Sequence, residues 1–216
     1  MTARRAKLIF IAAALAILAG CGSAILAPRP NFERYYVLTP VHGPAAASAA
    51  PTVPNPLTIG LGPLRLPAYL EHRSIVTRQA ANQIVLSSED RWAEPLSVNF
   101  ADVLGEDLSA ALENAHIVHY PWYSTVHVDY QVVVHVTRFE RTNGADTRLL
   151  AEWTIRAGAS QRPLLSGDCA ADENAQPNTI AGSVAALSAD VHQLSNQIAA
   201  AIRQLQSEKP DHRGAG

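Results

Sequence analysis

The sequence predicts an α+β fold: a single domain with a mixed, mainly antiparallel sheet and two helices packed on one face. Two helical patterns are separated by several short stretches of β type, and helices and strands do not alternate regularly. That order excludes a doubly wound parallel sheet. With 216 residues, 48% hydrophobic and 17% charged, the chain is long enough for one core and too apolar for global disorder.

Short β segments fill the first half of the predicted domain. Their apolar residues alternate with small or polar ones, or form brief β-type runs, as in strands with one buried face. We expect Gly62 and Pro63 to end the second segment and Ala80–Asn82 to turn a hairpin between the last two. The four segments are residues 35–38, 57–61, 74–78 and 83–87.

Pro95 opens the first helical pattern. Its apolar residues recur at spacings of three and four, which is typical of a helix with one buried stripe. We expect Asp102, Glu106 and Asp107 to lie mostly off that stripe. The stripe consists of Leu96, Phe100, Val103, Leu104, Leu108, Ala111 and Leu112.

The strongest β signal of the chain follows in residues 126–140. Apolar side chains from Val128 to Val136 share one parity, so they are expected to face a core. A turn at residues 143–146 should return the chain into a partner strand. The other strands expected in this half are residues 117–118, 148–156 and 163–167.

A second helix is predicted near the C-terminus, capped by Asn178 or Thr179. Apolar residues from Ile180 to Leu205 repeat at spacings of three and four, close to a heptad seam. Docking on the sheet is the main role expected for this seam. The alternative is that part of the seam meets another subunit.

Residues 1–20 have the features of a secretory signal peptide. Three basic residues precede an apolar run, Leu8–Leu18, that is too short for a standard transmembrane helix. The run ends in Leu18-Ala19-Gly20-Cys21, which resembles the bacterial lipobox. We therefore expect cleavage before Cys21 and acylation of its thiol. Gly22 after that cysteine favours sorting to the outer membrane.

The mature chain is divided by composition into tether, domain and tail. Residues 21–34 form the lipidated tether, and residues 35–207 form the domain. Within the domain, residues 40–56 are rich in Pro and Ala, which is typical of an exposed, semi-extended loop. Residues 208–216 are expected to be a flexible tail.

Charge and motifs exclude several classes of function. The formal net charge is −2, and removing the signal peptide leaves 14 basic against 19 acidic residues, so a nucleic-acid partner is not expected. With Cys21 acylated, Cys169 is the one remaining thiol. No phosphate-binding loop, nucleophile elbow or zinc-protease motif is present. His116 and His119 are interpreted as surface histidines, so we expect no metal, no cofactor and no enzyme.

Four segments together resemble the PqiC/YmbA family. They are Tyr35-Tyr36-Val37-Leu38, Ile59 to Leu70 (IGLGPLRLPAYL), Ile75-Val76-Thr77-Arg78, and Arg91-Trp92-Ala93-Glu94-Pro95-Leu96 running into Asn99-Phe100. They occur in this order behind the lipobox. The resemblance extends over roughly residues 35–205, and the loop of residues 40–56 departs from the compact family pattern.

The resemblance implies an auxiliary lipoprotein of an MCE-type and ABC-type intermembrane lipid transport system. Its partners would be an inner-membrane transporter component and an MCE-domain protein that forms a tunnel across the periplasm. This lipoprotein would dock the outer-membrane end of the tunnel, and homo-oligomeric rings are expected from the family. The alternatives are an outer-membrane assembly lipoprotein, for lipopolysaccharide or lipoprotein delivery, and a lipid-anchored hydrolase.

Four residues in the matching segments are candidates for partner binding: Tyr69, Leu70, Arg91 and Trp92. Trp is enriched at interface hot spots, but Trp92 next to Pro95 also fits a packed helix entry. A structural role remains the alternative for all four. Gly60 and Gly62 are expected to leave room for a close backbone approach, and Pro63 and Pro67 to fix a rigid turn.

Overall fold

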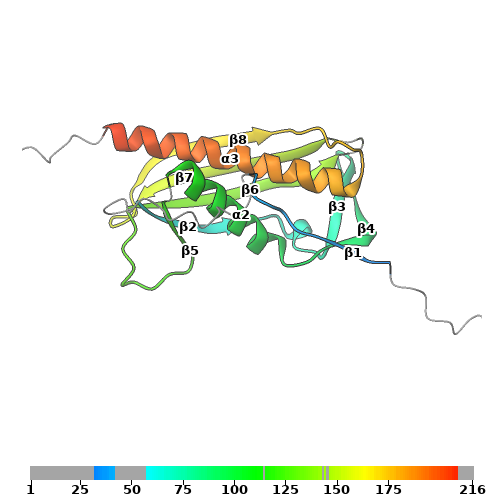
Figure 1. Ribbon diagram of the computed structural model, residues 1–216, viewed down its shortest axis with the longest axis horizontal. Helices are drawn as coiled ribbons and strands as arrows, with labels where there is room; N and C mark the ends of the chain where they lie inside the picture. The colour runs from blue at the N-terminus through cyan, green and yellow to red at the C-terminus, as the bar shows by residue number, and fades with distance from the viewer. Residues whose placement is uncertain (1–31, 42–56, 114, 143, 145, 209–216) are drawn as a thin grey trace, which may run out of the picture. The chain divides into compact units, whose positions relative to one another are not determined.

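In the described part of the chain, eight strands pair into one mixed sheet, and two helices lie against one of its faces (Figure 1). The computed structural model describes residues 32–41, 57–113, 115–142, 144 and 146–208. The elements within those ranges belong to a unit that begins at Glu33. The predicted α+β class, the mixed sheet and the two helices are confirmed.

The elements follow the expected order along the chain, and the strands are longer than predicted except for the first strand and the long strand that begins at Tyr130. A 3-10 turn, η1, is added after the second strand. The bounds are β1 Arg34–Tyr36, β2 Thr58–Arg65, η1 Ala68–Leu70, β3 Ser74–Ala80, β4 Gln83–Trp92, α2 Leu96–Ala111, β5 His116–His119, β6 Tyr130–Thr142, β7 Thr147–Ala157, β8 Pro163–Ala171 and α3 Ile180–Glu208.

Strand β6 is the centre of the sheet. One of its edges is shared by two parallel neighbours, β2 along its first half and β3 at its end. Its other edge carries the antiparallel strands β7 and β8. The sheet continues from β3 through β4 to β1 and from β2 to β5. The longest ladder, β6 with β7, is antiparallel, whereas β1–β4 and β2–β5 add further parallel pairs.

Strand β2 does not end at Gly62 and Pro63, so that prediction was wrong. The strand runs on to Arg65 because a shift in its pairing with β6 between Leu61 and Leu64 accommodates the interruption. Gly62 has a φ of +119°, which favours glycine. Its carbonyl accepts a 2.7 Å hydrogen bond from Gln131 Nε2, so the bulged backbone is tied to β6.

Strand β6 begins at Tyr130, later than predicted, and its expected core parity is confirmed. Val132, Val134 and Val136 are buried. Phe139 breaks the parity in sequence, yet it is also buried, because the register with β7 shifts between Val136 and Arg138. Its ring meets Phe100 of α2 edge to face, with centroids 5.0 Å apart.

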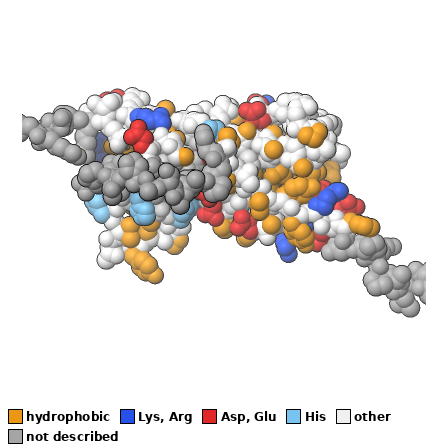
Figure 2. All heavy atoms as spheres, in the orientation of Figure 1, with side chains coloured by type: hydrophobic (Ala, Val, Ile, Leu, Met, Phe, Trp, Pro, Cys, Tyr) orange, Lys and Arg blue, Asp and Glu red, His pale blue; other side chains and the backbone are white. Residues whose placement is uncertain are grey.

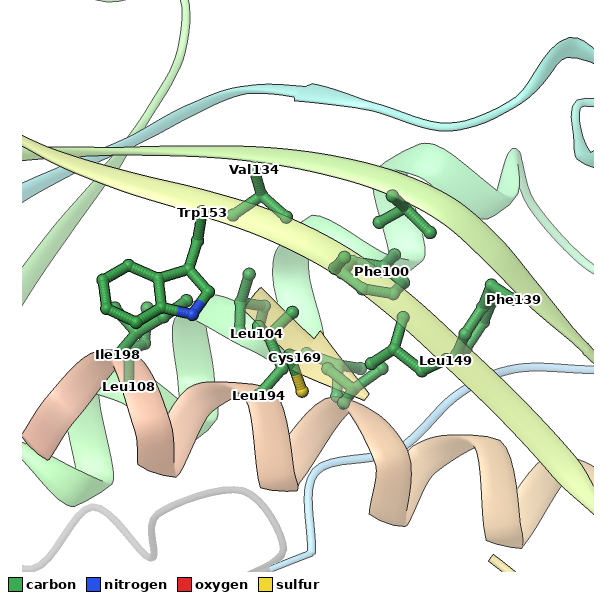
Figure 3. Packing of buried hydrophobic residues seen from close by; sticks show 14 of the residues in the cluster. Phe100, Leu104, Leu108, Val134, Phe139, Leu149, Trp153, Cys169, Leu194 and Ile198 are labelled. Atoms are coloured by element: carbon green, nitrogen blue, oxygen red, sulfur yellow. The ribbon is translucent and has the colours of Figure 1, made fainter. Parts of the chain in front are cut away.

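Both helices place their apolar stripes in one core (Figure 3). In α3 the predicted seam is buried within this single chain, which confirms docking on the sheet as its role here. Thr179 is the cap, because its Oγ1 accepts a 3.1 Å hydrogen bond from the Gly182 amide. In α2 Asp107 is buried, contrary to expectation, and its Oδ2 lies 3.4 Å from His192 Nδ1 of α3.

Neither helix within the described residues is both long and apolar enough to cross a bilayer. Cys21, the signal peptide, most of the tether, nearly all of the loop of residues 40–56 and the last eight residues lie outside the described part of the chain. The predictions for these segments therefore remain predictions.

Candidate functional site

Tyr69, one of the predicted partner contacts, belongs to a charged network between η1, β3 and β6. Its hydroxyl donates to Glu140 Oε2 at 2.5 Å. Arg78 Nε donates to the other carboxylate oxygen of Glu140 at 2.5 Å, and Arg138 Nε to the same oxygen at 3.0 Å. The guanidinium carbon of Arg78 also lies 5.6 Å from the centre of the Tyr69 ring. Glu140 is thus a fully buried carboxylate held by three donors.

The donors around Glu140 decide its protonation. Burial by itself would raise the pKa of the Glu140 carboxyl, but the hydrogen bonds from Arg78, Tyr69 and Arg138 outweigh burial and lower that pKa. Burial and the Glu140 carboxylate raise the pKa of Tyr69 to about 12. At neutral pH the network therefore holds one carboxylate, two guanidinium groups and a neutral phenol. These groups fix η1 to the sheet.

The other three predicted partner contacts, Leu70, Arg91 and Trp92, take no part in this network. Leu70 and Trp92 are buried at 1% and 4% exposure and belong to the hydrophobic core. Arg91 lies at the end of β4, where its guanidinium donates to the backbone carbonyls of Ser87 at 2.6 Å and Ser88 at 2.8 Å. Partner binding by these residues is a prediction that the structure leaves untested. The core positions of Leu70 and Trp92 match the structural alternative.

A more exposed group of aromatic side chains was not singled out from the sequence. The aromatic loop, residues 120–129 between β5 and β6, carries Tyr120 and Tyr123 at 55% and 83% exposure. The loop extends away from the sheet below β5 in Figure 1, and hydrophobic side chains mark its end in Figure 2. The sequence does contain a pattern that could have identified this loop, the run Tyr120-Pro121-Trp122-Tyr123, because only 6% of the chain is aromatic.

The aromatic loop packs against the two glycines of β2, Gly60 and Gly62. A Cβ added to Gly60 would lie 2.5 Å from Trp122 Cη2, and one added to Gly62 would lie 2.8 Å from Tyr120 Cβ. A close approach does occur at these glycines, but aromatic side chains make it rather than the backbone that was expected. Tyr120 and Trp122 pack edge to face, with ring centroids 5.6 Å apart.

A groove between α2 and β5 lies at the base of the aromatic loop. Asp102 and Glu106 come from α2, and His116 and His119 come from β5. Gly105 lets the two elements approach, since a Cβ there would lie 3.2 Å from the His119 ring. Within the described residues no group of three or more histidines, cysteines and carboxylates is arranged to hold a metal ion.

The thiol of Cys169 and the carboxyl of Asp190 are buried groups whose pKa values are raised. Burial, with a contribution from Asp190, raises the pKa of the Cys169 thiol to about 11, so this cysteine is not a thiolate at neutral pH. Burial also raises the pKa of the Asp190 carboxyl to about 7. Asp190 Oδ2 accepts a 2.7 Å hydrogen bond from Thr147, while its Oδ1 has no hydrogen-bond partner among the described residues. Sequence reasoning missed Asp190 because it stands inside the apolar seam of α3.

Comparison with known proteins gives one family. The model of the ABC-type transport auxiliary lipoprotein component matches residues 36–199, which is most of the chain. The match contains the four segments that carry the resemblance, except for Tyr35 at the start of the first one. No curated protein sequence matches the chain.

Two crystal structures have the same fold. A protein described as uncharacterized aligns with a TM-score of 0.64 at 20% identity, covering 79% of this chain and 98% of its own. Protein XCC0632 from Xanthomonas campestris aligns with a TM-score of 0.62 at 14% identity, covering 82% of this chain and all of its own. At these identities the comparison shows a shared fold alone.

Proposed function

Because the chain belongs to the family of ABC-type transport auxiliary lipoproteins, we propose that it is the non-catalytic auxiliary subunit of an MCE-type intermembrane lipid transport system. In this proposal the protein is anchored in the outer membrane at its periplasmic face. It docks the outer-membrane end of an MCE-domain tunnel whose other end meets an inner-membrane transporter component. The family match over residues 36–199 is the observation that carries the proposal.

The lipobox supports the proposed anchor. Acylated Cys21 would hold the chain in a membrane, because each buried CH₂ of an acyl chain contributes about 0.8 kcal/mol. Glu33, where the folded unit begins, follows Cys21 by twelve residues in the sequence. Even fully extended, such a segment reaches only about 40 Å. The domain would therefore stay close to the membrane surface, where the end of a periplasm-spanning tunnel is expected.

The environment of Cys169 argues against a hydrolase that uses this thiol. A hydrolase using this thiol would need it as an accessible thiolate beside a base. Cys169 is 2% exposed, and its pKa is raised to about 11. The contribution we propose for the protein is thus a surface for its partners. Assembly into a homo-oligomeric ring is part of the proposal, and native mass spectrometry of the detergent-purified lipoprotein would measure it.

Co-purification tests the proposed function. The tagged full-length lipoprotein is pulled down from detergent-solubilised envelopes, with Cys21→Ala in parallel. We expect an MCE-domain protein to be recovered with the wild type. Recovery of a β-barrel protein without an MCE-domain protein would replace the proposal with the outer-membrane assembly function.

A further inference from the structure

The aromatic loop is held in place by contacts with β2 and within itself. The Tyr120 amide donates to the Leu61 carbonyl at 2.9 Å, and the Trp122 ring occupies the space over Gly60. At the tip, the Val126 amide donates to the Tyr123 carbonyl at 2.9 Å and closes a turn. The exposed side chain of Tyr123 is thus carried by a backbone held in place by hydrogen bonds, which lowers the entropic cost of binding a partner.

The groove and the aromatic loop are neighbours in sequence and in space. His119, the last residue of β5, lines the groove and is followed directly by Tyr120 of the loop. Its Nδ1 lies 3.9 Å from Asp102 Oδ1 on the opposite wall. In Figure 2 histidine side chains lie near the base of the loop, above its hydrophobic end. One ligand can therefore contact both features.

Charge identifies the kind of ligand that fits this surface. Among the described residues, the groove lining includes the carboxylates of Asp102 and Glu106 and contains no lysine or arginine. An anionic membrane surface attracts basic protein segments and repels acidic ones, so it is a poor ligand here. A lysine or arginine side chain is a good one, because carboxylates pair with it and tyrosine ring faces attract cations. The exposed ring of Tyr123 would in addition cover apolar surface.

We propose that the aromatic loop and the α2–β5 groove form one docking surface for an extended protein segment that carries a lysine or arginine next to an apolar side chain. The basic side chain lies between Asp102 and Glu106, and the apolar side chain packs on Tyr123. The inference rests on the proposed function, because it assigns this segment to the MCE-domain protein.

Equilibrium binding of the detergent-purified, lipidated full-length chain to the purified MCE-domain protein of the same bacterium tests the proposal. One variant is Tyr123→Ala, and its control is Tyr35→Ala, which removes a half-exposed tyrosine on β1. The second variant combines Asp102→Lys with Glu106→Lys. Its control, Glu152→Lys with Asp168→Lys, makes the same charge change at paired exposed positions of β7 and β8. Circular dichroism and urea unfolding verify that each variant folds.

We expect each docking variant to bind at least about tenfold more weakly, and each control to bind within about twofold of the wild type. If the wild type binds and both docking variants bind as tightly as it does, this inference is overturned and the proposed function stands. Failure of the wild type itself to bind would overturn both. Added salt should weaken wild-type binding and change the binding of the double lysine variant much less.

A second measurement separates a protein partner from a membrane. The lipidated chain is reconstituted into vesicles of phosphatidylethanolamine and phosphatidylglycerol, with and without brominated acyl chains. Trp92 and Trp153 are buried, so Trp122 is the tryptophan that an inserted aromatic loop would bring to the bromines. We expect no quenching of tryptophan emission by the brominated lipids. Quenching that disappears in Trp122→Phe would show that the loop inserts into lipid and would overturn the proposal.

Discussion

Replacing Asp190 by asparagine should stabilise the protein, and the gain should depend on pH. Asp190 is fully buried, and Thr147 satisfies only one of its two carboxyl oxygens. The folded state therefore favours the neutral acid, and the pKa of Asp190 is raised from 3.8 to about 7. Asparagine has the same shape and resembles the protonated acid. Its amide oxygen can still accept the hydrogen bond from Thr147.

The sign follows from proton linkage. Below about pH 3 both the folded and the unfolded chain hold the Asp190 proton, so this group does not change the free energy of unfolding. Between about pH 4 and pH 7 the unfolded chain loses the proton first, and the free energy of unfolding falls. Above pH 7 the loss is complete. A shift of about three units at 1.36 kcal/mol each corresponds to roughly 4 kcal/mol.

Urea unfolding of the unlipidated mature chain, carrying Cys21→Ser and followed by tryptophan fluorescence, measures this term. The difference in unfolding free energy between Asp190→Asn and its parent should grow by roughly 4 kcal/mol from pH 4 to pH 8. Asp168→Asn, at an exposed position of β8, should show no comparable trend. Taking differences between variants cancels the other titrating groups. The same difference at pH 4 and pH 8 would refute the argument that burial keeps Asp190 neutral.

Three further predictions concern other parts of the chain. Glu140→Ala leaves Arg78 and Arg138 without their shared carboxylate and should lower the unfolding free energy by about 3 to 5 kcal/mol; a loss below about 1 kcal/mol would contradict the assigned network. Gly60→Ala places a methyl group against the Trp122 ring and should displace it, so acrylamide should quench tryptophan emission more strongly than in the wild type. Unchanged quenching would show that Trp122 does not pack against Gly60. Cys21→Ala should release the protein from alkali-washed membranes, and full retention there would contradict lipid anchoring.

The periodicity of the sequence was sufficient for both helices and for most strands. In α3 the spacing of apolar residues identifies the buried face because a helix returns to the same side every three to four residues. In β6 the alternation held only up to Val136, since the register shift before Arg138 reverses the parity. Whether a bulge ends or continues a strand depends on its neighbours in the sheet. The extension of β2 beyond Pro63 was therefore not readable from the sequence.

The candidate site was predicted less well than the fold. Tyr69 lies in a segment that the sequence singled out, but its partner Glu140 comes from the distant strand β6. Arg91 donates instead to Ser87 of its own strand, β4. The aromatic run that begins at Tyr120 was visible in the sequence, whereas its exposure depends on how the loop packs on β2. Long-range pairing of this kind leaves no local pattern. The sequence does supply the glycines that the packing requires.

The most direct test of the proposed function is binary binding between the purified lipoprotein and the purified MCE-domain protein of the same bacterium. Co-purification from envelopes includes indirect associations, whereas two purified components report only their own contact. We predict saturable binding with a defined stoichiometry. No binding at any accessible concentration, while the MCE-domain protein still binds its inner-membrane component, would contradict the docking role proposed for this lipoprotein.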